Sequence, residues 1–565
     1  MSIFAIIHSP MGIECKNCGT EFEITNEDLA FLDKLSPVFN GEKKLLPPPT
    51  ECPPCRQMRR MSFRNERMLH ERKCDVTGKD IISVHASDSP FTICEKNHWY
   101  SDKFDPLVYG RKYDFSRPFF DQFADLERSM PLPSLRVEKS ENCEYNNDVR
   151  DCNNCYICAR THMSQNLLYT YRGNKSSDSV DCMQITKCES LYECTECVSC
   201  YNSKYLFFCS ECSDSAFLLD CRNCTNCFMC TNLRNKKYYF LNEKLTKEKY
   251  EEKLVEFDFG SHHMVRKAYK MYADIRKKTI GRDLMIINSE NCSGDNLFEC
   301  KNCALCFSAQ QSENNRHLWD VKLFHDSMDA YSGGRNAELI YFTTAAAGSH
   351  NVQFCLRSSN SYNVCYSFFI NSSNDIFGSI GLKHEKYCIL NKQYTKEEYE
   401  EMIPKIIEHM KDTGEWGEFF PANISPFTYN ETVAQEYFPL SKEEAISKGY
   451  RWHDRDPKNY QKQTYKIPNC IDDVQDEITE SILSCVQCKK NYKIVPQELS
   501  FYRKHRIPIP HFCHDCRHMV RFSIRNPQKL RRDKCKKCEK SIMTTFTDDT
   551  EMQIYCESCY LDEVY

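Results

Sequence analysis

The residues best suited to chemistry are cysteines in C-x-x-C pairs near both ends of the chain. Two such pairs supply the four thiolates that a tetrahedral zinc ion takes in a structural site. Two pairs lie near the start of the sequence and four lie close together near its end: Cys15, Cys18, Cys52 and Cys55, then Cys485, Cys488, Cys513, Cys516, Cys535, Cys538, Cys556 and Cys559. The spacing predicts about three zinc ions, one at the first end and two at the second.

The two ends repeat each other. Residues 15–34 align without gaps on residues 485–504, and after a loop of different length residues 52–65 align on residues 513–526. The second N-terminal site is eroded in this comparison, because Cys74 and Cys94 remain while Thr77 and Asn97 stand in place of the other two cysteines. We therefore expect no zinc there, and we do not count the neighbouring residues Asp75 and His98 as ligands.

Both ends carry further residues of a known pattern. The C-terminal copy combines its first two C-x-x-C pairs with Phe501-Tyr502, Pro510 and an arginine, Arg517, directly after the second pair. Residues 485–517 resemble the probable zinc-ribbon domain family, and residues 15–56 resemble it too. The whole layout is similar to that of uncharacterised cysteine-rich bacterial zinc-binding proteins. The resemblance implies zinc but no reaction.

Basic residues surround both sets of pairs, although the whole chain has a formal charge of −5. Concentrated positive charge on a zinc module is suited to phosphate contact, so RNA or DNA is a candidate partner, with another protein as the alternative. The candidate contact residues are Arg56, Arg60, Arg64, Arg517, Arg521, Arg525, Arg531 and Arg532. The same charges could instead form a solvated face or pair with the acidic segments 472–480 and 248–256.

The elements between the two ends are also duplicated. Residues 237–252 recur as residues 386–401, each time after a stretch rich in Cys, Asn, Ser and aromatic residues. Within each stretch an Asn or Ser followed by apolar residues returns every ten to twelve residues, which is typical of a β-solenoid whose coils bury apolar side chains against one another. Segments 246–254 and 395–410 open with Thr-Lys-Glu and then show helical spacing, so a helix is expected to cap each block.

These observations predict a mainly β fold, with two central β-solenoid-like repeat blocks and capping helices between zinc-ribbon-type modules at both termini. The expected parts are an N-terminal module at 1–130, a first block at 139–260, a helical connector at 261–290, a second block at 291–412, a connecting segment at 413–470 and a double zinc module at 471–565.

The central cysteines offer a different chemistry. Four of them, Cys221, Cys224, Cys227 and Cys230, have the spacing C-x-x-C-x-x-C-x-x-C, and three shorter runs accompany them: Cys152-155-158, Cys194-197-200 and Cys300-303-306. Such runs are close to those that hold iron–sulfur clusters, which would make the protein an electron carrier or redox protein. Leu, Val or Ala replaces Cys at equivalent places in the rhythm, however, which favours packing.

The sequence contains none of the common motifs of nucleotide-binding proteins and hydrolases. We find no glycine-rich phosphate loop, nucleophile elbow or H-E-x-x-H helix, and the acidic residues Asp178, Asp181, Asp214 and Asp220 show no distinguishable catalytic pairing. The first eleven residues, MSIFAIIHSPM, lack the form of a secretory signal, and no segment has the ~20 apolar residues that span a bilayer. We expect a cytoplasmic, non-catalytic scaffold or adaptor with no membrane contact and no small-molecule substrate.

Overall fold

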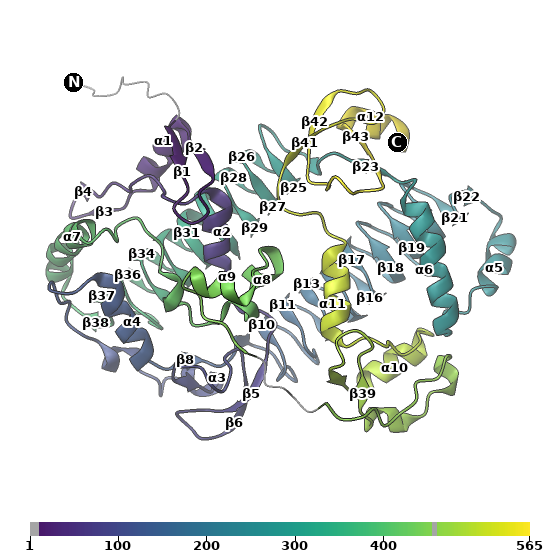
Figure 1. The fold of residues 1–565 in the computed structure, drawn as a ribbon, viewed down its shortest axis with the longest axis horizontal. Coiled ribbons are helices and arrows are strands. Elements are labelled where there is room, and N and C mark those ends of the chain that lie inside the picture. The colour runs from purple at the N-terminus through teal and green to yellow at the C-terminus, as the bar shows by residue number, and fades with distance from the viewer. Residues whose placement is uncertain (1–10, 455–459) are drawn as a thin grey trace. The chain divides into compact units, whose positions relative to one another are not determined.

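The protein forms two compact units, neither of which is continuous in sequence. The structure, a computed structural model, describes residues 11–454 and 460–565. Unit 1 combines residues 1–134 with 285–454, and unit 2 combines residues 135–284 with 455–565. Each cysteine module therefore packs on the solenoid block that lies farther from it in sequence: the N-terminal module on the second block, and the C-terminal module on the first (Figure 1).

Unit 2 is built on a parallel β-solenoid that runs from β9 (Val137–Glu138) to β22 (Glu243–Lys244). Strands stacked on one another pair with an offset of twelve residues: Asn147 lies opposite Ala159, and Ala159 opposite Tyr171. The coil is therefore twelve residues long, at the upper end of the predicted step. The predicted solenoid fold is confirmed.

A shorter period of three residues lies inside each coil. Every third residue has a left-handed backbone, as at Asp151, Asn154 and Ile157, where φ is 52°, 52° and 50°. Asn and Asp adopt this conformation more readily than other non-glycine residues, which explains why Asn is so frequent here. The residue that follows each of them points inward and is small: Cys152, Cys155 and Cys158 are all buried. The C-x-x-C-x-x-C runs of the central blocks therefore have the period of the coil interior.

Unit 1 contains the second solenoid block, from β24 (Ile286–Ile287) to β38 (Lys392–Gln393). Its two longest strands, β30 (Phe324–Gly334) and β31 (Ala337–Ala347), pair with an offset of thirteen residues, with Phe324 opposite Ala337. One extra residue in this coil shifts the rhythm. That shift gives the repeat its less regular appearance in the middle of the block.

Helices close one end of each block and pack along the coils. The predicted caps are α5 (Lys247–Val255) and α7 (Lys396–Asp412), whose N-cap residues Thr246 and Thr395 accept hydrogen bonds from the backbone. The remaining helices of unit 1 are α1 (Asn26–Leu35), α2 (Pro53–Met61), α3 (Lys96–Trp99), α4 (Phe119–Ser129), α8 (Val433–Tyr437) and α9 (Lys442–Ser447). Those of unit 2 are α6 (His262–Arg276), α10 (Pro496–Lys504), α11 (His514–Ser523) and α12 (Glu557–Val564).

Aromatic side chains join the helices to the outer faces of the coils. In unit 1, Phe123 of α4 packs against Phe368 of the solenoid and against Phe420, with ring centroids 4.8 and 4.7 Å apart. In unit 2, Tyr272 of α6 packs against Phe217 at 5.5 Å. Within the described ranges, no helix is both long enough and apolar enough to cross a membrane.

Candidate metal centres

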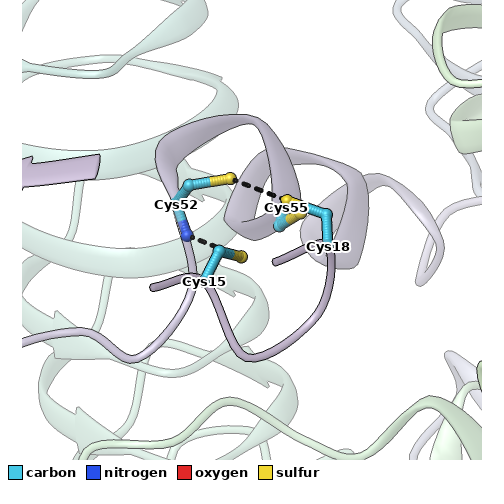
Figure 2. Close-up of side chains that lie close together, drawn as sticks. All are labelled: Cys15, Cys18, Cys52 and Cys55. Carbon is cyan, nitrogen blue, oxygen red and sulfur yellow. Dashed lines mark hydrogen bonds between the residues drawn. The ribbon is translucent and has the colours of Figure 1, made fainter. Parts of the chain in front are cut away.

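Four cysteines of the N-terminal module meet at one point. Cys15 and Cys18 lie in the turn after β1 (Met11–Glu14), while Cys52 and Cys55 lie at the start of α2. Their four sulfur atoms all lie within 4.8 Å of one another. Figure 2 shows the four side chains close together. The sulfur of Cys18 is 3.8 Å from that of Cys52, and the backbone N–H of Cys52 donates to the sulfur of Cys15 at 3.2 Å. One ion could contact all four thiolates.

The C-terminal module repeats this arrangement twice. Cys485, Cys488, Cys513 and Cys516 form one group and Cys535, Cys538, Cys556 and Cys559 form the other, again with all sulfurs within 4.8 Å of one another. The predicted ligand cysteines therefore converge in the predicted groups of four, which we call the first, second and third tetracysteine sites in chain order. This arrangement indicates three metal sites.

The local fold is the same at each tetracysteine site. The first pair of cysteines lies in a turn that closes through a hydrogen bond, as from Gly19 N–H to Cys15 O at 2.8 Å, with Gly19 at a φ of 71°. The second pair begins a helix, whose N-cap residue is Cys52 in the first site, Cys513 in the second and Cys556 in the third. The N–H groups at a helix N-terminus favour a negatively charged thiolate.

In each of the first two sites, one thiol ionises more readily than a neighbouring thiol. A hydrogen bond with Cys55 lowers the pKa of Cys52 to about 5, and the same bond raises the pKa of Cys55. In the second site burial opposes ionisation, but backbone N–H groups of Cys488 and Cys513 lower the pKa of Cys485 to about 6. Four thiolates around one ion leave no position for water, so such a site holds structure and does not activate a nucleophile.

The eroded site keeps its backbone geometry, and the structure corrects its alignment by one residue. Cys74 lies in the same turn, and its sulfur accepts hydrogen bonds from the N–H groups of Thr77 at 3.2 Å and Glu95 at 3.1 Å. Glu95 is the N-cap residue of α3, the place that Cys556 takes before α12. Glu95 and His98, rather than Cys94 and Asn97, thus correspond to Cys556 and Cys559. The misalignment arose because Cys94 lies one residue before the helix.

Most of the predicted nucleic-acid residues lie inside the protein. Arg56 and Arg60 of α2 are buried in unit 1, and both contact Asp329 of β30: Arg56 Nε lies 2.8 Å from Oδ2, and Arg60 Nη1 lies 3.1 Å from Oδ1. Arg64 pairs with Glu66 at 2.8 Å, also out of contact with solvent. A guanidinium group that is buried against a carboxylate is not available to a phosphate.

Unit 2 repeats this contact with other residues. Arg517 and Arg521 of α11 both contact Asp181 of the first block, with N–O distances of 2.9 and 3.1 Å. Arg525 pairs with Glu196 at 2.8 Å and is largely buried. The partners are thus acidic residues of the coils and not the two acidic segments considered from the sequence.

A signal for this docking was present in the sequence. The three arginines of each module are four residues apart, a spacing that predicts one helix face. In the structure the first two share a face of α2 or α11, and the third, Arg64 or Arg525, lies just beyond the end of the helix. When such a helix docks with its arginines buried, carboxylates must lie opposite them, because a buried charge needs a partner. Asp181 stood among the unpaired acidic residues, but nothing in the sequence assigned it to an arginine 336 positions away.

The last two predicted contact residues lie at the third tetracysteine site. Arg531 pairs with Asp533 and Asp548, both at 2.9 Å, whereas Arg532 is exposed. Both belong to β41 (Arg531–Lys534), which forms a hairpin with β42 (Ser541–Thr544). Nucleic-acid contact remains a prediction.

The central cysteine runs form no comparable group of four within the described residues. Cys221, Cys224, Cys227 and Cys230 point into one coil, where each sulfur lies against backbone carbonyl oxygens. Cys230 Sγ, for example, is 3.2 Å from Phe228 O. An iron–sulfur cluster spaces its cysteines more widely than a single ion does, so this geometry does not test the cluster hypothesis. It does show how the thiols fill the coil.

All 37 cysteines lie in the described part of the chain and none of them forms a disulfide there. No family model, curated protein or solved structure matches this chain, so the tetracysteine modules are compatible with zinc ribbons by their geometry alone.

Proposed function

We propose that the protein is a zinc-binding scaffold in which each tetracysteine module docks on a β-solenoid block. The observation that carries this proposal is the convergence of four thiols at three separate places. Two of these modules also insert a helix with buried arginines against a solenoid carboxylate. The metal would shape the module, and the arginines would fix it on the coil.

The donor set favours zinc. Four thiolates in tetrahedral reach select zinc or an iron–sulfur centre over oxygen-seeking ions such as Mg²⁺ or Ca²⁺. Each site here joins a knuckle turn to a helix start, which is the arrangement of structural zinc modules. Zinc in these places would supply folding free energy directly.

The test is metal analysis of the full chain purified without oxygen. We expect about three zinc ions per chain and neither iron nor acid-labile sulfide in stoichiometric amounts. Cys488→Ser should lower the zinc content by one, while Cys470→Ser, a half-buried cysteine outside the three sites, should leave it unchanged. Stoichiometric iron and sulfide would contradict the scaffold and support a redox protein.

We further propose that the scaffold contacts nucleic acid through the hairpin of the third tetracysteine site. Arg532, Lys534 and Lys536 are exposed, and the described residues around them form no ion pair with these three side chains. Such unpaired cations gain free energy by releasing counterions from a phosphate backbone. Because Arg532 alone of the eight predicted arginines is exposed, it is the principal candidate.

Fluorescence anisotropy with single-stranded RNA and duplex DNA tests this contact. We expect binding that weakens with salt, and a loss of roughly tenfold or more in Arg532→Glu/Lys536→Glu because each lost phosphate contact reduces the salt-dependent term. The matched control, Lys396→Glu/Lys405→Glu, reverses two exposed charges on α7. Absence of binding by the wild-type chain at low salt would exclude the contact and leave a protein as the partner.

A further inference from the structure

Unit 1 holds a second type of metal-ligand cluster, away from the cysteines. His70, Glu431 and His453 each place one ligand atom so that all three atoms lie within 4.8 Å of one another. They come from three separate segments: His70 begins β5 (His70–Lys73), Glu431 ends the short helix η3 (Tyr429–Glu431), and His453 follows in the connecting segment. No sequence motif marks this cluster, because its members do not share one local segment of the chain.

One ring nitrogen of the cluster is buried without a hydrogen-bond partner among the described residues. His70 Nε2 lies 2.8 Å from Glu431 Oε1, yet this buried nitrogen makes no hydrogen bond of good geometry with any described residue. The other carboxylate oxygen of Glu431, Oε2, accepts a hydrogen bond from the Thr428 hydroxyl at 2.9 Å. The Thr428 hydroxyl thus orients the Glu431 carboxylate so that Oε1 faces the His70 ring.

Neighbouring groups also fix the second histidine. The side chain of Asn430 accepts a hydrogen bond from His453 N–H at 3.0 Å and donates one to His453 O at 2.9 Å. Asp88 Oδ2 lies 3.5 Å from His453 Nδ1. A carboxylate beside one ring nitrogen is the usual outer partner of a metal-bound histidine, because it orients the ring and leaves the other nitrogen free.

The simpler interpretation is a pairwise contact between His70 and Glu431 alone. That pair accounts for His70, but it does not account for a second imidazole in the same place, with the two ring centroids 5.6 Å apart. Two imidazoles and one carboxylate with ligand atoms within 4.8 Å of one another suit a divalent cation. The side chains are 22%, 10% and 18% exposed in chain order, so an ion could reach them from solvent.

We propose that His70, Glu431 and His453 bind one first-row divalent metal ion, Zn²⁺ or Fe²⁺, and leave at least one coordination position open. Two histidines and one carboxylate form the ligand set of catalytic zinc sites and of non-haem iron sites, both of which keep room for water or substrate. The tetracysteine sites, by contrast, are closed. Among the clusters in the described structure, this one would leave room for a water molecule on the bound metal ion.

The site belongs to unit 1 alone. The alignment that pairs Cys74 with Cys535 also pairs His70 with Arg531, and Arg531 forms ion pairs in the third tetracysteine module. The hairpin of β5 with β6 (Asp80–Ser83), which flanks Cys74 of the eroded site, therefore also carries the first ligand of the proposed site.

Cobalt titration of the full chain, already loaded with zinc at its tetracysteine sites, tests the proposal. We expect one further Co²⁺ per chain by equilibrium dialysis, with weak visible absorbance and without the strong near-ultraviolet band of a cobalt–thiolate bond. Competition by Zn²⁺ and, without oxygen, by Fe²⁺ then identifies the preferred ion.

Substitutions assign the additional ion to these residues. His70→Ala and His453→Ala should each weaken its binding by about 100-fold or more, since even outer partners of a metal ligand are worth 10–100-fold. His350→Ala is the matched control, because His350 also lies beside a carboxylate, Glu338, at 3.3 Å but has no second histidine. Retention of the ion in both variants, or no additional ion in the wild-type chain, would overturn the proposal.

A measurement on the wild-type chain guards against variants that fail to fold. Added Zn²⁺ or Co²⁺ should protect His70 and His453, but not His350, from acylation by diethyl pyrocarbonate, read by mass spectrometry. If added metal leaves the extent of modification of His70 and His453 unchanged, the proposed site would also be overturned.

Discussion

Each unit holds a small module on a β-solenoid, but the side-chain contacts that hold it differ between the two units. Trp99 of unit 1 and Tyr560 of unit 2 stand at equivalent places, one residue after the last ligand position of their modules, and both are buried. Trp99 packs against Phe104 and the solenoid residue Phe369, with centroids 5.6 and 6.0 Å apart. Tyr560 instead donates a hydrogen bond to Asp220 of the coil.

This difference accompanies a difference in the cysteines available to bind metal. The third tetracysteine module has a small apolar core, built around Ile542 and Ile554 beside its cysteines. The eroded module has lost that ligand set but lies against a large aromatic core that includes Phe119, Phe123 and Trp99. Apolar burial of this extent can stabilise a module without metal. The core of the third module is much smaller, because only the partly buried Phe546, Met552 and Tyr555 add to its two isoleucines, so we expect it to need the metal.

The largest expected effect comes from removing ligands of the third tetracysteine site. Cys535→Ser/Cys559→Ser should unfold residues 527–565 locally, because zinc binding by such sites provides about 10–16 kcal/mol of apparent free energy. Hydrogen exchange read by mass spectrometry should show loss of protection in these peptides and retention in unit 1.

The eroded module supplies the contrast for this experiment. Cys74→Ala removes a sulfur that accepts two backbone N–H groups, so we expect a cost of about 1–3 kcal/mol without local unfolding. If residues 527–565 of the cysteine variant stay as protected as in the wild-type chain, metal does not hold this module and the comparison between the units fails.

The next effect concerns the buried carboxylates that receive the helix arginines. Asp329→Asn should destabilise the docking of α2 by about 3–5 kcal/mol, because Arg56 and Arg60 would keep a buried charge without its carboxylate. Asp181→Asn should cost roughly half as much, since Glu498 remains 3.4 Å from Arg517 and Glu193 remains 3.2 Å from Arg521. Exchange protection of α2 and α11 in increasing denaturant measures both costs.

Asp326→Asn is the control on the same strand. Asp326 pairs with Lys34, whose side chain is 49% exposed, so its loss should change stability by less than about 1 kcal/mol. Equal costs for Asp181→Asn and Asp329→Asn would show that the additional carboxylates of unit 2 contribute nothing to docking.

Some features of the fold and the sites could be predicted from the sequence, and others could not. The ligand sets of the tetracysteine sites, the solenoid blocks and the helices capped by Thr246 and Thr395 depend on local spacing, and all of them were predictable. The cysteine runs also contain the interior period of three, although the prediction from the sequence covers only the longer step of ten to twelve residues. Local spacing decides which residues point inward, so a sequence can reveal it.

The pairing of modules with blocks was not predictable. Arg517 and Asp181 are separated by 336 positions, and the chain order gives no reason for the C-terminal module to dock on the first block. His70 and Glu431 meet for the same kind of reason, through the packing of two distant segments of unit 1. Basic residues near a zinc module look like a nucleic-acid surface until their carboxylate partners are known.

The last expected effect is a dependence on pH that only unit 2 should show at this contact. Glu193 lies one coil beyond Asp181 and contacts Arg521, while the equivalent place in unit 1 holds Phe342, whose ring lies 5.0 Å from the Arg60 guanidinium carbon. Burial raises the pKa of Glu193 to about 7, and Asp181 adds to the rise against the attraction of Arg521.

A carboxyl whose pKa is higher in the folded protein holds its proton after the unfolded chain has lost it. The free energy of unfolding should therefore be greatest below about pH 4.5 and fall as the pH rises to about 7, by on the order of 3 kcal/mol. Urea unfolding of unit 2 at pH 5 to 8, followed by exchange labelling at one fixed pH, measures this slope. Glu193→Gln should flatten it, because an amide does not titrate, whereas Glu211→Gln on an exposed face of the same block should not. An unchanged slope in Glu193→Gln would mean that the proton belongs to another carboxyl of this contact, and Glu498→Gln would then be the variant to compare, since burial raises the pKa of Glu498 too.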